Sequence, residues 1–345
     1  MILLLGQSGE EHNNPSLATR ATEITAMKPT GMNPMKTVHS LSVVVPVYNS
    51  EDSLPLLIER LDLVMPSFGV PYEVILVNDG SRDRSWESIC ESARSRDWVL
   101  GINLMRNYGQ HNALLCGIRA ANSDVVVTID DDLQNPPEEI GKLLIELDKG
   151  FDVVYGTPLK EQHGILRNAA SQITKIMLQN AMGTRIARQV SAFRVFRTGL
   201  RAASDQCHGP FLSIDVLLTW GTTRFSAVTV RHDSRQVGAS NYTLPKLIAH
   251  AFNMMTGFST LPLQIGSLVG FAFTIFGFGV LAYVVGRYLV EGAAVQGFAF
   301  LASIIAIFSG VQLFALGMIG EYLARMHFRM MERPTYVVRA TTRDK

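Results

Sequence analysis

The sequence lacks a dominant charge, a paired-cysteine pattern and a secretory leader. Its 31 basic side chains offset 30 acidic ones and leave a formal net charge of +1, so no global field favours nucleic acid as a partner. The three cysteines, Cys90, Cys116 and Cys207, do not form a C-x-x-C spacing, so neither a zinc site nor a disulfide framework is indicated. We expect them to be buried thiols in a reducing compartment.

The first 38 residues also lack hydrophobic periodicity. Met1–Leu5 is a short apolar run without the basic flank and the length of a signal peptide. We predict a flexible N-terminal tail over residues 1–38. The alternative is an over-extended start, with the true initiation site at Met27, Met32 or Met35.

Two long runs near the C-terminus contain no charged residue. They are Leu263–Gly286 and Gly297–Gly320, each of 24 residues. A helix of this length spans about 36 Å and crosses a hydrocarbon core of about 30 Å with some tilt. A buried helix of a soluble protein would normally show a polar stripe, which these runs lack. We predict two transmembrane helices within residues 263–320.

The flanks of these runs predict their direction. A short connection, Arg287–Gln296, makes the two spans a hairpin. In the following segment, Arg325, Arg329, Arg333 and Arg339 lie within reach of the membrane. Positive residues stay in the cytoplasm. We therefore predict a cytoplasmic basic tail over residues 321–345 and a cytoplasmic catalytic domain, both attached to the inner (cytoplasmic) membrane.

Apolar residues at helical spacing precede the first span. They run from Leu244 to Phe258, so we predict a juxtamembrane amphipathic segment over residues 241–262. This segment either lies in the headgroup layer, in contact with membrane lipids, or packs on the catalytic domain.

Residues 39–240 alternate between apolar, β-branched runs and segments with helical spacing. Strands are predicted over Leu41–Val47, Tyr72–Val77, Val99–Leu104, Asp124–Ile129 and Phe151–Tyr155. Helices are predicted over Asp52–Met65, Asp83–Ala93, Gly109–Ala121 and Pro137–Leu147. This order predicts an α/β catalytic domain with a doubly wound, mostly parallel sheet, followed by the transmembrane hairpin. Such sheets bind ligands beyond the carboxyl ends of their strands.

Polar motifs follow three of these strands, where such a sheet would bind its ligand. Pro46–Glu51 follows the first strand, Asn78–Ser81 the second, and Asp130–Pro137 the fourth. In an extended segment Asp130 and Asp132 point the same way, and paired carboxylates suit Mg²⁺ or Mn²⁺ with a diphosphate as the remaining ligand. The alternative is a solvated acidic turn or a helix cap.

The motifs VPVYN, VNDGS and DDDLQNPP, in this order and spacing, resemble those of the family 2 glycosyltransferases, which have the GT-A fold. Two further motifs, RNYGQHNA at Arg106–Ala113 and RHDSRQVGASNYT at Arg231–Thr243, resemble the polyprenyl-phosphate glycosyltransferases among them. The similar subgroups are the undecaprenyl-phosphate aminoarabinose transferases, the bactoprenol glucosyltransferases and, more distantly, the dolichyl-phosphate mannose synthases. The resemblance covers Leu41–Tyr336.

This resemblance implies roles for individual residues. It assigns the nucleotide pocket to Pro46, Tyr48, Glu51 and Asp79, the last at the uracil edge. It assigns the metal and diphosphate cluster to Asp130, Asp132 and Gln134. It assigns contacts with acceptor or diphosphate to Arg167, Ser171, Arg194, Arg235 and Ser240. The implied catalytic residues are Asp130, Asp132 and Arg235. His111 either contacts the donor phosphate or caps a helix.

The implied activity is an inverting glycosyltransferase. It would move one sugar from a UDP-sugar to undecaprenyl (polyprenyl) phosphate, giving a lipid-phosphate-linked sugar for cell-envelope glycan or lipid A modification. The Q-x-x-R-W motif of processive synthases is absent from the sequence, which favours transfer of a single sugar. The resemblance also implies Mg²⁺ or Mn²⁺ as cofactor and a homo-oligomer, often a tetramer.

Two other functions compete with this interpretation. A membrane-bound nucleotidyltransferase or pyrophosphorylase would also use paired acids, but it predicts a Gly-rich, basic loop after the first strand. The loop here, Val47–Glu51, is acidic and contains no glycine. A non-catalytic membrane scaffold is the third hypothesis, and the intact acids Asp79, Asp130 and Asp132 argue against it.

Overall fold

One mixed β-sheet organises the catalytic part of the chain. The structure, a computed structural model, describes residues 37–158, 189–204, 213–233, 261–291, 297–331 and 333–343. Within these ranges the strands are β1 (Leu41–Val47), β2 (Tyr72–Asn78), β3 (Val99–Leu104), β4 (Val125–Thr128), β5 (Val153–Pro158), β6 (Arg194–Arg197), β7 (Phe225–Val230) and β8 (Val338–Thr341). Their order in the sheet is β7-β5-β6-β4-β1-β2-β3-β8.

The first four strands form the parallel centre of the sheet. β1 pairs with β2 on one side and with β4 on the other, and β2 pairs with β3, all in parallel register. β6 is antiparallel to both β4 and β5, β5 is parallel to β7, and β8 is antiparallel to β3. The chain therefore reverses its direction of progress across the sheet between β1 and β4.

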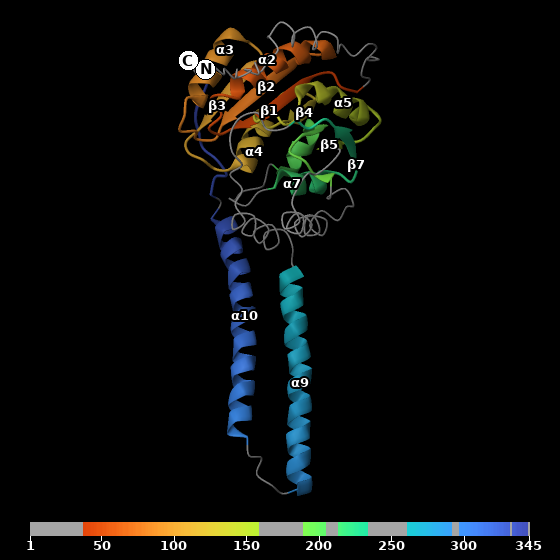
Figure 1. The fold of residues 1–345 in the computed structure, drawn as a ribbon, viewed down its shortest axis with the longest axis vertical. Helices are drawn as coiled ribbons and strands as arrows, with labels where there is room; N and C mark the ends of the chain where they lie inside the picture. The colour runs from red at the N-terminus through yellow and green to blue at the C-terminus, as the bar shows by residue number, and fades with distance from the viewer. Residues whose placement is uncertain are drawn as a thin grey trace, which may run out of the picture. The chain divides into compact units, whose positions relative to one another are not determined.

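Helices cover both faces of the sheet (Figure 1). The described α-helices of this part are α2 (Leu54–Val64), α3 (Ser85–Ser95), α4 (Gln110–Ala120), α5 (Ile140–Asp148) and α7 (Ile214–Gly221). The 3-10 helices are η1 (Met65–Phe68), η2 (Pro137–Glu139) and η4 (Thr198–Ser204). One group of helices is formed by α2, which contacts α3 and η2, and by α5, which contacts η2. A second group is formed by α4, which contacts α7 and η4.

The core explains why β1 reads as a continuous apolar run. All seven residues of β1 are buried, as expected for a central parallel strand that is covered on both faces. α4 packs closely on this strand because Gly117 has no side chain: a Cβ there would collide with Val44 of β1. This close approach holds the N-terminal end of α4 near the carboxyl ends of the central strands.

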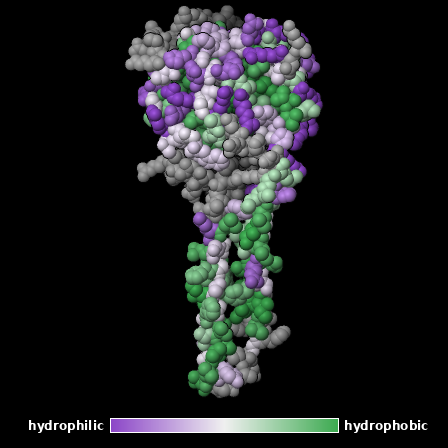
Figure 2. Space-filling view, turned by 180° about the vertical axis from the view of Figure 1, so that it is seen from behind, coloured by the Kyte–Doolittle hydropathy of each residue, from purple (hydrophilic) through white to green (hydrophobic). Residues whose placement is uncertain are grey.

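Two long helices make up the apolar part of the chain. α9 (Leu261–Glu291) and α10 (Phe298–Met330) contain the predicted spans, and both have the length and composition to cross a membrane. Their surface is largely apolar, whereas the surface of the sheet domain is largely polar (Figure 2). α10 continues past Gly320, where the predicted second span ends, to Met330. The amphipathic segment predicted at Leu244–Phe258 lies outside the described residues.

The C-terminal segment is a part of the sheet, which the prediction of a basic tail over residues 321–345 did not foresee. β8 pairs with β3 through Ile102 opposite Thr341 and Leu104 opposite Val338. Tyr336 adds a contact with α4, because the Arg119 guanidinium lies over its ring at 5.9 Å. The chain therefore returns from α10 to the domain that it left before α9.

The other predicted elements are confirmed with small shifts at their ends. The predicted strands correspond to β1–β5, and the predicted helices to α2, α3, α4 and η2 with α5. The α/β, mostly parallel sheet followed by two long apolar helices is therefore confirmed.

Gly80 permits a close backbone approach between the segments that follow β2 and β3. Its φ is +66°, and a Cβ would lie 2.5 Å from the carbonyl carbon of Arg106. We predict that Gly80→Ala destabilises the protein by about 2 kcal/mol or more, because it adds a backbone clash to left-handed strain. Gly69 is the matched control: it has the same φ and no atom within 4 Å of its Cβ position.

Thermal unfolding of the full chain in detergent measures this difference. The midpoint should fall clearly further for Gly80→Ala than for Gly69→Ala. Equal shifts would contradict the close approach.

Candidate functional site

The topology of the sheet locates the candidate site. In open α/β sheets, ligands bind beyond the carboxyl ends of the strands where the strand order reverses. Here that point lies between β1 and β4, so the segments that begin at Tyr48 and at Ile129 flank it. The Ser50 hydroxyl donates a hydrogen bond to the Asp131 carboxylate, which joins the two segments directly.

Three consecutive carboxylates lie at the end of β4, and a separate partner holds each of them. The Gln110 amide donates to Asp130 Oδ1 at 2.7 Å. Ser50 holds Asp131, and the backbone N–H of Gln134 donates to Asp132 Oδ1 at 3.1 Å. Asp131 and Asp132 lie in a turn, whereas the predicted alternation assumed an extended segment, so the common direction of Asp130 and Asp132 stays a prediction.

Burial and mutual repulsion disfavour ionisation of these acids. Burial, together with the neighbouring charges of Asp132 and Asp131, raises the pKa of Asp130 to about 7. Burial also raises the pKa of Asp131 to about 6, although the Ser50 hydrogen bond opposes this rise. A positive charge between Asp130 and Asp132 would relieve the repulsion.

The turn after these acids is held in an unusual conformation. Leu133 has a φ of +60°, which is uncommon for a residue other than glycine, and its side chain is buried. Such strain persists only where the surroundings impose it, and it is frequent at functional sites. The strained turn brings the Gln134 backbone under the Asp132 carboxylate.

The carboxylates after β4 could supply part of the coordination shell of a divalent cation. Among the described residues, no group of three or more histidine, cysteine, aspartate or glutamate side chains is placed to hold a metal ion. Mg²⁺ is commonly held by one or two carboxylates, with phosphates of the substrate and water completing its shell. Asp130 and Asp132 match that arrangement, and Gln134 lies beside Asp132.

The segment after β1 carries the predicted nucleotide-pocket residues. Pro46 is buried within β1, whereas the Tyr48 side chain is 43% exposed at the carboxyl end of the strand. The Glu51 N–H donates to Asp83 Oδ2 at 3.1 Å, and Glu51 Oε2 accepts the Arg84 N–H at 2.9 Å. This segment is therefore fixed against the residues that follow β2, with the Tyr48 ring exposed.

Asp79 is almost fully buried and its carboxylate has two backbone partners. Its oxygens accept the N–H groups of Tyr108 and Gly109 at 2.7 and 2.8 Å. Burial still raises its pKa, although both hydrogen bonds lower it. Asp79 therefore ties the segment after β3 to the segment after β2, and its contact with a uracil edge stays a prediction.

Arg194, a predicted contact with acceptor or diphosphate, is one of the described residues, and that role stays a prediction. It lies in β6, 1% exposed, and its guanidinium pairs with the buried Asp215 carboxylate. Its Nε donates to the Thr128 hydroxyl at 3.0 Å, and the Tyr155 hydroxyl donates to Asp215 at 3.1 Å. This buried network joins β4, β5, β6 and α7 behind the carboxylates.

Four predicted residues, Arg167, Ser171, Arg235 and Ser240, lie outside the described residues. His111 lies in the first turn of α4, where its Nδ1 accepts the Ile214 N–H of α7 at 3.5 Å. Sequence reasoning did not single out Gln110 and Ser50, which hold Asp130 and Asp131. The feature of the sequence that could have identified Gln110 and Ser50 is their position inside motifs at the carboxyl ends of strands.

Comparisons with known proteins identify the family. The model of the glycosyl transferase family 2 matches residues 42–206. The undecaprenyl-phosphate 4-deoxy-4-formamido-L-arabinose transferase of Pectobacterium atrosepticum is 36% identical over 307 residues, which are 88% of this chain and 94% of that protein. The protein of the same name from Yersinia enterocolitica is 35% identical over 89% of this chain and 95% of its own length. The chain belongs to the family 2 glycosyltransferases.

A solved structure with a similar sheet is the glucosyl-3-phosphoglycerate synthase of Mycobacterium tuberculosis, in complex with Mn²⁺, UDP and phosphoglyceric acid. It is 19% identical, with a TM-score of 0.47, over 68% of this chain and 80% of that chain. The predicted membership of this family is confirmed by the sequence relatives, and the chain is a family 2 glycosyltransferase.

The raised pKa of Asp130 predicts a pH-dependent stability of this glycosyltransferase without metal. An unfolded aspartate loses its proton near pH 4, whereas folded Asp130 loses it near pH 7. Rising pH therefore favours the unfolded state between these values. Asp130→Asn cannot ionise, so it should unfold at a higher temperature than the parent at pH 8, and the difference should shrink toward pH 4.

Thermal unfolding in detergent with a chelator, at pH values from 4 to 8, measures this difference. Asp97→Asn, at an exposed position between α3 and β3, is the control and should show no such trend. A difference for Asp130→Asn that does not grow with pH would contradict the burial and repulsion at this site.

Proposed function

We propose that this family 2 glycosyltransferase is a metal-dependent, inverting enzyme that transfers one sugar from a UDP-sugar to undecaprenyl phosphate. The observation that carries the proposal is the pair Asp130 and Asp132 at the switch point between β1 and β4. Relatives that match 94–95% of their own length carry the name of undecaprenyl-phosphate sugar transferases, which supports the acceptor. The product would supply cell-envelope glycan or lipid A modification.

The segments around β1 and β2 supply the donor site in this proposal. The exposed Tyr48 ring offers a face on which uracil can stack, and aromatic rings stabilise such contacts. Pro46, Glu51 and Asp79 shape the pocket around it, Asp79 by fixing the neighbouring backbone. The diphosphate then extends toward Asp130 and Asp132, across the contact between Ser50 and Asp131.

The chemistry of the acceptor removes the need for a general base. A phosphate monoester has a second pKa of about 6, so the lipid phosphate arrives largely ionised at neutral pH. Its oxygen attacks the anomeric carbon while the bond from that carbon to the UDP oxygen breaks, and a single displacement inverts the configuration. Because the acceptor is already ionised, neither Asp131 nor Asp215 is needed as a base. Asp131 instead accepts a hydrogen bond from Ser50, and Asp215 pairs with Arg194.

The remaining task is to manage negative charge. A bound Mg²⁺ or Mn²⁺ would neutralise the departing diphosphate as a Lewis acid. Asp130 and Asp132 would hold it, with Gln134 beside them. Arg167, Ser171, Arg235 and Ser240 are the proposed contacts for acceptor and diphosphate, by family resemblance. Arg194 is buried in the core and pairs with Asp215, so in this assignment it supports the site from behind.

We propose that α9 and α10 span the membrane as a hairpin with the catalytic domain on the cytoplasmic side. The support is topological: β8 lies in the same sheet as the strands that precede α9. The chain must therefore cross the bilayer an even number of times. The arginines after α10 favour the cytoplasm for this side. The proposal keeps the division into residues 39–240, 241–262, 263–320 and 321–345, and β8 of the last part pairs with the sheet of the first.

Removal of one metal ligand tests the assignment. We predict that Asp132→Ala lowers transfer at least about 100-fold, the scale at which loss of a key electrostatic group lowers turnover. Transfer of labelled sugar is measured from a panel of UDP-sugars to undecaprenyl phosphate in detergent, with Mn²⁺. The panel contains UDP-4-deoxy-4-formamido-L-arabinose, UDP-glucose and UDP-N-acetylhexosamines. Glu91→Gln, an exposed acid on α3, is the control and should keep parental activity.

Near-parental transfer by Asp132→Ala would overturn the metal assignment. Failure of the parent to label undecaprenyl phosphate from any donor would overturn the acceptor. Thermal stabilisation by UDP with Mn²⁺ is expected for the parent. Stabilisation by nucleoside triphosphates alone would favour a nucleotidyltransferase instead.

Reporter fusions test the proposed orientation. A green fluorescent protein fused after Lys345 should fluoresce, because it folds in the cytoplasm. An alkaline phosphatase fused after Glu291, at the end of α9, should be active, because it folds only outside the cytoplasm. Active phosphatase at Lys345 would contradict the hairpin with both ends in the cytoplasm.

A further inference from the structure

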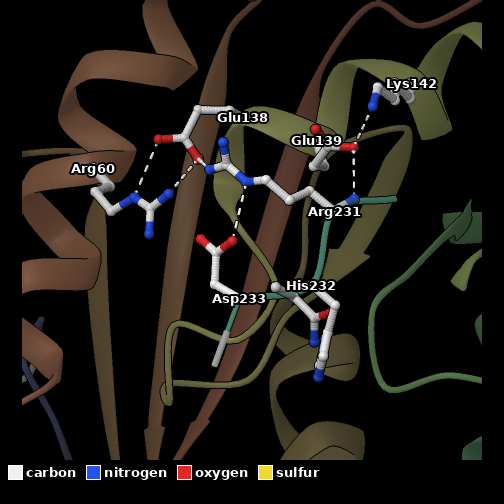
Figure 3. Close-up of polar contacts among 8 residues, drawn as sticks. Arg60, Glu138, Glu139, Lys142, Arg231, His232 and Asp233 are labelled. Atoms are coloured by element: carbon white, nitrogen blue, oxygen red, sulfur yellow. Dashed lines mark hydrogen bonds and ion pairs between the residues drawn. The ribbon is translucent and has the colours of Figure 1, made fainter. Parts of the chain in front are cut away.

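The chain that leaves β7 runs beside the segment with Glu138 and Glu139 (Figure 3). Its first three residues, Arg231–Asp233, are called the exit segment here. The Arg231 N–H donates to Glu139 Oε2 at 3.2 Å, and His232 Nδ1 lies 3.3 Å from Asn135 Oδ1. The exit segment thus runs antiparallel to residues 134–139, directly after the acids.

A backbone relay links the exit segment to a proposed metal ligand. The Asp233 N–H donates to the Gln134 carbonyl oxygen at 2.9 Å. The N–H of the same residue, Gln134, donates to Asp132 Oδ1 at 3.1 Å. Leu133, between them in sequence, has the strained φ of +60°. The backbone of Gln134 therefore accepts a bond from Asp233 at its carbonyl oxygen and donates one to Asp132 from its N–H.

Ion pairs hold the exit segment from the side. The Arg231 guanidinium lies between Asp233 Oδ1 at 3.2 Å and Glu138 Oε2 at 4.0 Å, and Arg60 of α2 makes two hydrogen bonds to Glu138 (Figure 3). The Arg231 side chain is 46% exposed, so its ion pairs contribute little to global stability. The exit segment can therefore be loosened by substitution without unfolding the domain.

We infer that the exit segment is a positioning element of the transferase, which orients the Asp132 carboxylate through the backbone of Gln134. This inference rests on the proposed metal role of Asp130 and Asp132. The basic motif with Arg235 and Ser240 begins in the same stretch of sequence, so one stretch contains both the positioning element and the proposed acceptor contacts.

A proline at position 233 tests the relay, because proline lacks the N–H that Gln134 accepts. Asp233→Ala is the matched control: it removes the carboxylate that pairs with Arg231 but keeps the N–H. Binding of Mn²⁺ to the full chain with saturating UDP is measured by the electron paramagnetic resonance signal of free Mn²⁺. Thermal unfolding of each variant is measured in parallel.

Asp233→Pro should weaken Mn²⁺ binding about 10-fold, the usual cost of losing a group that orients a metal ligand. Asp233→Ala should weaken it less than about threefold, because exposed ion pairs contribute little. In transfer assays Asp233→Pro should lower kcat and leave the KM for undecaprenyl phosphate near the parental value. Equal Mn²⁺ affinities for the two variants would overturn the inference.

Asp132→Ala separates failure of the inference from failure of the proposed function. If Asp132→Ala loses Mn²⁺ binding while Asp233→Pro equals Asp233→Ala, only the positioning role is wrong. If Asp132→Ala binds Mn²⁺ like the parent, both the metal assignment and the positioning role are overturned.

If Asp233→Pro does not fold, the double variant Arg231→Ala/His232→Ala replaces it. This variant removes the Arg231 contact with Glu138 and the His232 contact with Asn135, which Asp233→Ala leaves in place, so it should weaken Mn²⁺ binding more than Asp233→Ala does. The conservative pair Arg231→Lys/His232→Gln should restore it. Parental binding by the alanine pair would then overturn the inference.

Discussion

Three consecutive carboxylates at the end of β4 repel one another, and the surrounding site is arranged around that repulsion. Ser50 from the segment after β1 holds Asp131, and Gln110 from α4 holds Asp130. The Gln134 backbone holds Asp132. Burial and repulsion raise the pKa of Asp130 to about 7, and in the proposed function a divalent cation would relieve this repulsion. The donor diphosphate supplies the remaining ligands in the proposed reaction.

The return of the chain to its own sheet links chemistry to membrane topology. β8 pairs with β3, and Tyr336 contacts Arg119 of α4, the helix whose first residue, Gln110, holds Asp130. A hairpin whose two ends join one domain keeps that domain on one side of a bilayer. A phosphate acceptor anchored by its lipid chain would then meet the donor on the same side.

The sequence predicted the parts of the fold and site whose signals are local. β1 reads as a buried strand from its own residues, and Asp130 and Asp132 stand out because they follow the apolar run of β4. β8 was missed because it is four residues long and its partner strand is distant: Gly101 and Thr342, which hydrogen-bond, are 241 residues apart. The ion pair of Arg194 was not predicted, because its partner Asp215 belongs to α7, another element of the fold. Both features depend on pairing between residues that are far apart in the sequence, which local sequence patterns do not reveal.

The location of the donor at the carboxyl ends of β1, β2 and β4 is the central claim, and photo-crosslinking tests it most directly. The full chain in detergent is irradiated with 5-azido-UDP and Mn²⁺, and the modified peptides are identified by mass spectrometry. The account predicts labels in the segments after β1 and β2, around Tyr48 and Asp79, and competition by unlabelled UDP. Labels that unlabelled UDP displaces, but that lie only on β5, β7 or α7, would contradict it.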